Sequence, residues 1–336
     1  MKKRFNIYLK FIVSAILISF MFLNFSGCAA KTDASDPASS ASIAATSTVP
    51  LSSYPVEIKD ANGNVVTFNK KPVKIVSLTL TTDEILLSIT SEANIAAISN
   101  VASDEGLSNV VSEAKKFPSV QGSEPEKIIA LQPDVVFAAD FTDAKTIKQL
   151  TDAGIKVYQF ATPNSIDEVV QLIRNIAMIT GDTGKGEDLI AWMNAKLDFV
   201  KSKVAGLSES QKLTAMSCDS FFYTYGKGTT FDDIAVHAGL IDLAAASGIQ
   251  KWQQIQKEKI IVMNPDAIFL PSWSYPGFDA VKFVSDFKSD KSLSTVKAIK
   301  NNRVFSLPES HMTSVSQNIV LGVEDAARAA YPNLFK

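Results

Sequence analysis

A twelve-residue segment occurs twice in this chain of 336 residues. Residues 126–137 read EKIIALQPDVVF and residues 258–269 read EKIIVMNPDAIF, so seven of the twelve positions are identical. The offset between the two glutamates that begin the copies is 258 − 126 = 132 residues. Repeat arrays have periods of roughly 20–50 residues and need at least three copies, so this spacing indicates a duplicated lobe and not a solenoid. We therefore expect two similar lobes.

Residues 1–27 have the features of a signal peptide. Four basic residues within residues 2–10 precede an uncharged apolar run from Phe11 to Phe25. About twenty apolar residues are needed to span a bilayer, so this run suits a cleaved signal better than a stable membrane span. The run ends in Phe25-Ser-Gly-Cys28, which resembles the bacterial lipobox, except that Phe25 stands where an aliphatic residue is usual. The resemblance implies cleavage before Cys28 and lipidation of its thiol. An ordinary secretory signal followed by a chance cysteine is the alternative.

Residues 28–53 predict a flexible tether. They are rich in Ala, Ser and Thr and poor in large side chains, so they cannot bury enough apolar surface to offset the entropy of ordering. A lipid on Cys28 would hold the folded body at the outer face of a bacterial cytoplasmic membrane, which is the periplasmic side if the cell has an outer membrane. The second cysteine, Cys218, lies in an apolar stretch and is expected to be buried, without a disulfide.

The balance of charge argues against a nucleic-acid partner. The chain has 33 basic and 35 acidic residues, and four of the basic ones lie in the signal peptide, so the remainder carries 29 − 35 = −6. Nucleic-acid binding depends on neutralising phosphates with Lys and Arg. We expect a small-molecule ligand and a monomeric protein.

Short apolar strands alternate with helices on both sides of the middle of the chain, which is typical of parallel βαβ units. An Asn62-Gly63 hairpin opens the body. The predicted domains are an N-terminal lobe (54–165), a linker helix region (166–206) and a C-terminal lobe (207–336). Expected strands are 56–59, 65–68, 75–77, 95–98, 135–138, 155–158, 213–216, 267–270 and 304–306. Expected helices are 83–89, 126–131, 143–153, 166–204 with a break at 181–184, 231–238, 278–287 and a last one ending near 330. The fold class is therefore α/β, with two Rossmann-like lobes of mostly parallel sheets, a long connecting helix, and a ligand cleft between the lobes at the strand ends.

Several motifs resemble one family of transport proteins over nearly the whole body. They are residues 122–134 in the first lobe, residues 252–260 with Asn264-Pro-Asp266 in the second, Thr82-Asp-Glu-Ile-Leu86, and a terminal helix over 316–328. Together they resemble the substrate-binding lipoproteins of ABC importers for iron-siderophores, haem and vitamin B12. The resemblance implies a lipid-anchored extracytoplasmic protein that captures a metal chelate and delivers it to a permease dimer with its ATPase subunits. No bound cofactor and no enzymatic activity are expected.

The resemblance also assigns a role to the glutamate that heads each repeat. In the family, such a glutamate on each lobe pairs with permease arginines, and Glu126 and Glu258 occupy those positions. Carboxylates on both lobes can engage a two-fold symmetric permease by charge-assisted contacts. A helix capping box is the alternative for Glu126, because Ser123 lies three residues before it. The corresponding residue before Glu258 is Ile255, which cannot cap a helix.

Candidate ligand contacts are residues near predicted strand ends. They are Thr79, Thr81, Thr82, Gln121 and Phe141 in the first lobe, and Tyr223, Tyr225, Trp252, Trp273, Tyr275 and His311 in the second. Trp252 matches a family position that lines the ligand site. Flat aromatic faces with a polar edge suit a bulky chelate, although each aromatic residue taken singly also fits local core. The three arginines outside the signal peptide are not clustered, which favours a neutral or mildly charged ligand over a highly anionic one.

Other classes of function lack their motifs. No His, Asp and Glu set has the spacing of a direct divalent-metal site. Gly226-Lys-Gly-Thr-Thr230 lacks the spacing of a phosphate-binding loop, and no catalytic constellation is evident. A binding lipoprotein for a bare metal ion or an oxyanion remains the alternative, with a two-lobed α/β enzyme or an adhesin as remote ones.

Overall fold

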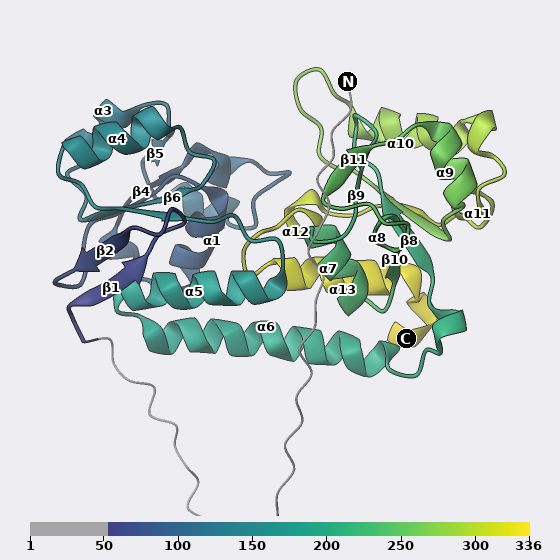
Figure 1. Ribbon diagram of the computed structural model, residues 1–336, viewed down its shortest axis with the longest axis horizontal. Coiled ribbons are helices and arrows are strands. Elements are labelled where there is room, and N and C mark those ends of the chain that lie inside the picture. Colours follow the sequence, from purple (N-terminus) through teal and green to yellow (C-terminus); the bar gives the residue numbers. More distant parts are fainter. Residues whose placement is uncertain (1–52) are drawn as a thin grey trace, which may run out of the picture. The chain divides into compact units, whose positions relative to one another are not determined.

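A five-stranded parallel sheet forms the centre of the first lobe (Figure 1). The computed structural model describes residues 53–336; the predicted signal peptide, Cys28 and the tether lie outside the described residues. The strand order is β5-β4-β3-β6-β7, and a separate hairpin, β1-β2, precedes it. The strands are β1 (Val56–Lys59), β2 (Val65–Phe68), β3 (Ile75–Ser77), β4 (Ile95–Ser99), β5 (Ser119–Val120), β6 (Val135–Ala139) and β7 (Val157–Phe160). The helices are α1 (Leu80–Ile89), α2 (Val111–Ala114), α3 (Pro125–Ala130) and α4 (Ala144–Asp152), with 3-10 turns at Glu92–Asn94 and Asn100–Ser103.

A four-stranded parallel sheet in the order β10-β8-β12-β13 forms the second lobe. Its strands are β8 (Thr214–Ser217), β10 (Ile241–Asp242), β12 (Ala267–Leu270) and β13 (Val304–Ser306), and a two-stranded antiparallel sheet joins β9 (Tyr223–Tyr225) to β11 (Trp252–Gln254). The helices are α7 (Thr230–His237), α8 (Leu243–Ala246), α9 (Lys257–Met263), α10 (Ala280–Ser289), α11 (Lys297–Lys300), α12 (Glu309–Met312) and α13 (Ile319–Ala330), with 3-10 turns at Glu209–Gln211, Lys291–Leu293 and Pro332–Phe335. The predicted α/β class with two parallel-sheet lobes is confirmed.

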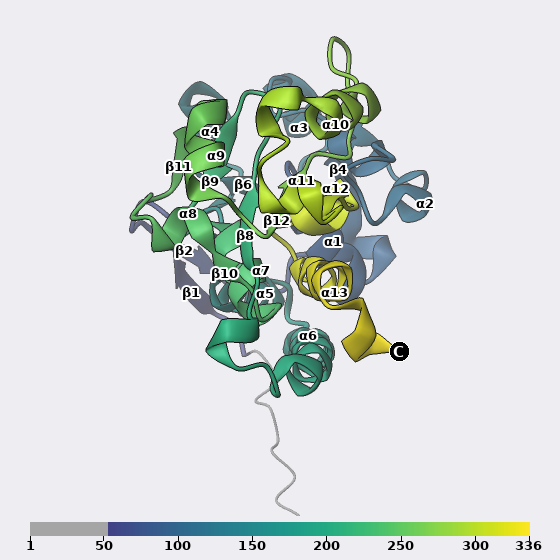
Figure 2. The same cartoon turned by 90° about the vertical axis from the view of Figure 1, so that its right-hand side faces the viewer.

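Two antiparallel helices occupy the predicted linker region. α5 (Ile166–Thr180) ends at Gly181, whose φ of 68° is left-handed, and α6 (Thr183–Val204) begins two residues later. A Cβ on Gly186 would lie 2.6 Å from the Cβ of Ala177, so this glycine permits the close packing of α5 on α6. α6 packs against α1 and α5 on one side and against α7 and α13 on the other, and Figures 1 and 2 show it passing beneath both lobes. Of the two helices, α6 is the one that joins the lobes.

The duplicated segment encodes the same helix, turn and strand in each lobe. α3 and α9 are followed by Gln132 and Asn264, whose φ values of 49° and 50° are left-handed. The aspartate of each Pro-Asp pair then anchors the neighbouring strand. Asp134 Oδ2 accepts the backbone N–H groups of Val73 and Lys74 at 2.9 and 3.0 Å. Asp266 Oδ2 accepts the backbone N–H and hydroxyl of Thr214 at 3.0 and 2.7 Å. Each Pro-Asp pair therefore has a structural role in its lobe.

Element boundaries differ from the sequence prediction where hydrogen bonds cap or close the end of a helix. Strand β7 begins at Val157 and not at Ile155, because the backbone N–H of Ile155 bonds the Leu150 carbonyl and closes α4. Helix α1 begins at Leu80 and not at Asp83, because Thr79 caps it. Helix α10 begins at Ala280, after the side chain of Asp279 caps its first turn. The β9-β11 pair was not predicted.

A buried carboxylate connects the two lobes. Glu84 on α1 is 2% exposed, and its Oε1 accepts the backbone N–H and the side-chain Nδ2 of Asn109 at 2.9 and 3.0 Å. Its Oε2 accepts Asn318 Nδ2 at 3.0 Å and the Ser316 hydroxyl, both from the segment before α13. Buried charges persist only where hydrogen bonds compensate the lost hydration. The Glu84 network therefore ties α1 to the segment that leads into α13.

Beside it, Asp83 is completely buried and predicts a pH dependence of stability. Burial raises the pKa of Asp83 to about 7, and the hydrogen bonds from Ser77 and Ser99 only partly oppose this. The folded state holds this proton more tightly than the unfolded state, so its contribution to stability is present at about pH 4 and is lost as the pH rises to about 7. The slope is at most about 1.4 kcal/mol per pH unit.

We expect the Asp83→Asn variant to lose this slope, because its amide does not titrate. Urea unfolding of wild type and variant between pH 4 and 8 measures the difference. Equal slopes for both proteins would contradict the assignment to Asp83.

Candidate functional site

A cavity of about 260 Å³ lies at the carboxyl ends of β8 and β12 in the second lobe. Most of its lining is apolar. The lining residues are Ser217, Cys218, Asp219, Tyr225, Thr230, Phe231, Phe269, Leu270, Pro271, Leu307, Glu309, Met312 and Thr313. Ligands of parallel α/β sheets bind beyond the carboxyl ends of the strands, so this cavity is the candidate ligand site of the second lobe.

Asp219 follows β8 and is held by hydrogen bonds within the turn that leads to β9. Its Oδ1 accepts the backbone N–H groups of Phe221 and Tyr223, both at 2.9 Å. Its Oδ2 accepts the phenol of Tyr225 at 3.0 Å, and its backbone N–H donates to the Tyr223 carbonyl at 3.0 Å. Burial and the negative charge of Asp219 raise the pKa of Tyr225, which keeps the phenol protonated as a donor.

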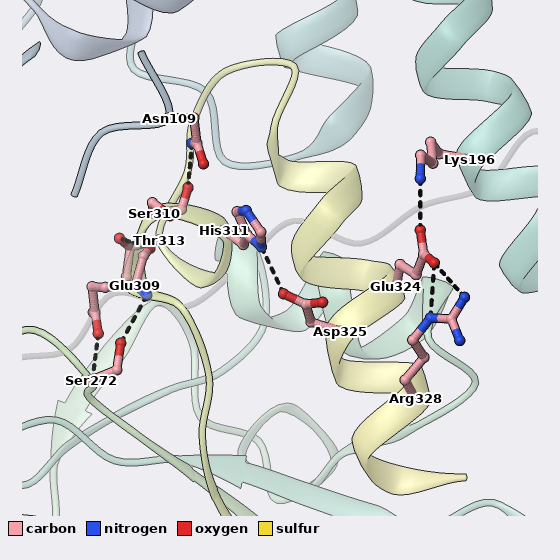
Figure 3. A network of polar contacts seen from close by, with 10 residues as sticks. All are labelled: Asn109, Lys196, Ser272, Glu309, Ser310, His311, Thr313, Glu324, Asp325 and Arg328. Carbon is pink, nitrogen blue, oxygen red and sulfur yellow. Dashed lines mark hydrogen bonds and ion pairs between the residues drawn. The ribbon is translucent and has the colours of Figure 1, made fainter. Parts of the chain in front are cut away.

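Glu309 begins α12 and is fixed by the loop after β12. Its Oε2 accepts the backbone N–H of Ser272 at 2.9 Å, and its own backbone N–H donates to the Ser272 Oγ at 2.9 Å (Figure 3). Burial raises the pKa of Glu309, and the negative charge of Asp219 raises it further. Both carboxylates line the same cavity.

The first lobe contacts α12 directly. The Nδ2 of Asn109 donates to the Ser310 carbonyl at 2.9 Å (Figure 3), while the same residue also bonds Glu84. The cavity wall and the contact between the lobes thus share one short helix.

The predicted threonines lie in the helix start of the first lobe. Thr82 is 0% exposed, and its hydroxyl lies 2.6 Å from the Ser77 hydroxyl and 2.9 Å from that of Thr79. Thr79 caps α1 through the backbone N–H of Thr82, and Thr81 is 7% exposed. In this geometry the threonines stabilise the start of α1, and Thr79, Thr81 and Thr82 remain predicted ligand contacts.

Phe141 and Gln121 lie on the surface of the first lobe. Phe141 follows β6 and is 74% exposed, and it lines a groove that also includes Glu126 and Gly122. Gln121 is exposed just after β5. Both remain predicted ligand contacts.

The predicted aromatic residues of the second lobe occupy three different environments. Tyr225 lines the cavity, whereas Tyr223 is half-buried on the same strand. Trp252 pairs with Tyr225 across β9 and β11, and its side chain is 61% exposed. Trp273 and Tyr275 form an aromatic row with ring centroids 5.0 Å apart, continued by Phe278 at 5.1 Å from Tyr275.

His311 lies on the α13 side of α12. Its Nδ1 is 2.7 Å from Asp325 Oδ2 on α13 (Figure 3), and it does not line the cavity. Glu324, the residue before Asp325 on α13, forms ion pairs with Lys196 of α6 at 3.0 Å and with Arg328 at 2.7 Å. Within residues 53–336, no group of three or more His, Cys, Asp or Glu side chains could hold a metal ion. His311 as a ligand contact remains a prediction.

Glu126 and Glu258 take equivalent positions in the two lobes. Each is the second residue of its helix, α3 or α9, and each is exposed. No hydrogen bond or ion pair joins either carboxylate to another described residue. The capping-box alternative for Glu126 is wrong, because α3 has no side-chain cap and Glu124, not Ser123, precedes its first residue. Both helices lie on the side of the lobes away from α6 (Figure 1).

Sequence reasoning missed Asp219 and Glu309. Both follow the carboxyl end of a core strand, as the predicted contacts do, so the same positional argument could have found them. Cys218 is buried, as predicted, and burial with the charge of Asp219 raises the pKa of its thiol to about 12. The thiol is therefore an apolar part of the cavity wall.

The sequence matches the family described as periplasmic binding protein over residues 75–311. An uncharacterised ABC transporter substrate-binding lipoprotein of Bacillus subtilis is 29% identical over 346 residues, covering 100% of both chains. A cobalamin-binding protein of Halobacterium salinarum is 23% identical over 228 residues, covering 64% of this chain and 58% of that one. The molybdate-binding protein of Haemophilus influenzae is 25% identical over 233 residues, covering 63% and 64% of the two chains. Its structure with molybdate has a TM-score of 0.68 at 22% identity, covering 83% of this chain and 92% of that one.

Gly106 in the first lobe makes the contact with Trp273 testable. A Cβ at this position would lie 2.1 Å from the Cδ1 atom of Trp273, so the Gly106→Ala variant must displace the indole or the loop. We expect a loss of about 1–3 kcal/mol of stability, typical of overpacking, and a shifted tryptophan emission spectrum.

Gly122→Ala is the matched control, because its added Cβ meets only the Thr142 Cγ2 at 3.8 Å. Urea unfolding and fluorescence of the two variants provide the comparison. An alanine at residue 106 that behaves like the control would contradict the close contact.

Proposed function

Because the chain belongs to the periplasmic binding protein family, we propose that it is a lipid-anchored extracytoplasmic binding protein that delivers a metal chelate to an ABC importer. Its partners in this proposal are a permease dimer with ATPase subunits and the membrane, reached through a lipid on Cys28. The name of the Bacillus subtilis relative supports the lipoprotein and transporter assignments. Within residues 53–336, no helix has the length and apolarity to cross a membrane. The protein is proposed to act as a monomer.

The observation that carries the proposal is the equivalent placement of Glu126 and Glu258. A residue kept only for local structure would be expected to bond its own helix or a neighbour, but neither carboxylate does so among the described residues. Exposed carboxylates can instead form bidentate, charge-assisted contacts with arginines of a partner. One such group on each lobe matches the two halves of a permease dimer.

A chelate is the proposed ligand because the candidate site presents aromatic side chains on a mostly apolar surface. Phe231, Phe269 and Tyr225 line the cavity, and the exposed Trp252 on β11 pairs with Tyr225. Aromatic surfaces suit a large ring system or a shielded metal, and a cavity of about 260 Å³ would hold one part of such a ligand. The cobalamin-binding relative supports a corrinoid. The alternative, an oxyanion or bare metal ion, has support from the molybdate-binding relative.

Charge reversal of both docking glutamates is expected to abolish uptake and leave ligand affinity within about two-fold, because the carboxylates lie outside the cavity. The Glu126→Lys/Glu258→Lys variant is compared with wild type in a cellular uptake assay and by calorimetric titration. The control is Glu57→Lys/Glu209→Lys, which reverses two other exposed glutamates. Wild-type uptake by the docking variant would refute the docking role.

Titration against ferric hydroxamates, haem, cobalamin and molybdate tests the ligand class. We expect quenching of tryptophan fluorescence by one of the three chelates and none by molybdate. The Trp252→Ala substitution is expected to weaken binding of that chelate at least five-fold, because a contact with an aromatic side chain contributes about 1 kcal/mol. Calorimetric titration measures the change. Binding of molybdate alone would replace the chelate proposal with the oxyanion alternative.

A further inference from the structure

The cavity of the second lobe has an uncompensated negative end. Asp219 and Glu309 are its two charged lining residues, and none of the described residues that line it is Lys, Arg or His. The first turn of α7 also borders the cavity, but Asp232 and Asp233 in that turn offset the positive end of its dipole. The local field therefore favours a positive charge.

Both carboxylates are held in place and retain capacity to accept more hydrogen bonds. Asp219 Oδ2 has one donor, Tyr225, and Glu309 Oε2 is bonded to the Ser272 backbone. A carboxylate offers about four acceptor sites, so each group can accept a further donor without giving up the contacts that position it. A cation in the cavity would be attracted by both carboxylates, because both line it.

A buried polar atom in the cavity wall lacks a hydrogen-bond partner among the described residues. The Oγ of Ser217 exposes less than 1 Å² and has no hydrogen-bond partner among the described residues, although it belongs to the cavity lining. A buried hydroxyl without a partner costs roughly 1–3 kcal/mol. A rotation of this side chain toward the cavity would let a polar group there satisfy it.

We propose that this cavity binds an alkylammonium group of the transported ligand, with Asp219 and Glu309 as acceptors and Ser217 as a third polar contact. An ammonium has three donors and no acceptor, which matches this set. Phe231, Phe269 and Met312 line the rest of the cavity and would contact the alkyl stem. A ligand arm that ends in carboxylate or phosphate is excluded by charge. The inference rests on the proposed function, because it assigns a chemical class to part of the ligand that this site would bind.

Small probes test the cavity without any chelate. Chemical shifts of the isotopically labelled protein are followed during titration with n-butylammonium and, separately, with butyrate, which has a similar stem and the opposite charge. We expect butylammonium to shift the amides of Asp219, Tyr223 and Glu309 at millimolar concentration, and butyrate to leave them unchanged. The Asp219→Asn/Glu309→Gln variant should bind butylammonium at least five-fold more weakly than wild type.

The matched control, Asp286→Asn/Glu209→Gln, removes two acidic groups of the same lobe outside the cavity and should bind like wild type. Glu309→Gln alone, whose amide oxygen can still accept the Ser272 N–H, serves if the double variant does not fold. Equal or tighter binding of butyrate, absence of shifts at the cavity, or equal binding by all variants would overturn the inference. Chelates that bind while butylammonium does not would overturn this inference alone. Butylammonium binding without any chelate binding would instead refute the proposed function.

Discussion

The arrangement of the two lobes depends on the buried carboxylate of Glu84. Removing a charged group from water costs several kcal/mol unless hydrogen bonds replace its hydration. Here the donors come from Asn109 in the first lobe and from Ser316 and Asn318 in the segment before α13. Separating the segments would leave the charge without its partners in an interior site. The network therefore disfavours other arrangements of α1 and the segment before α13.

This constraint extends to the candidate ligand site through Asn109. The side chain of Asn109 bonds both Glu84 and the carbonyl of Ser310, and the residue before Ser310 is Glu309 of the cavity wall. A ligand that shifts α12 must therefore strain a hydrogen bond to the first lobe, and a movement of the lobes must act on α12. Because α6 also packs against helices of both lobes, we expect movements of the lobes relative to each other to be small. Flexible strand crossovers, which permit large hinge motions, are replaced here by packed helices.

The sequence predicted what local patterns encode. The duplicated segment predicted two similar lobes, and its expected helix (126–131) and strands (135–138 and 267–270) agree with α3, β6 and β12. The Glu84 network could not be predicted in this way, because Glu84 and Asn318 lie 234 residues apart in the sequence. The β9-β11 pair was missed since its strands have three residues each and lack an apolar run. A residue after a strand, such as Thr82, can cap a helix as readily as it can contact a ligand, so its position alone is compatible with both roles.

Burial and partners separate three kinds of carboxylate that are alike in the sequence. Glu84 is buried and its oxygens accept four hydrogen bonds, so its role is structural. Glu126 is exposed and forms no hydrogen bond or ion pair with another described residue, so its carboxylate is free to bind another protein. Asp219 lies between these extremes, because local donors position it while one side still faces a cavity. A group that is fixed but not saturated can recognise a ligand without first reorganising, and this preorganisation lowers the entropy lost on binding. Recognition in this protein thus depends less on which residues are acidic than on how many hydrogen bonds each carboxylate has left to accept.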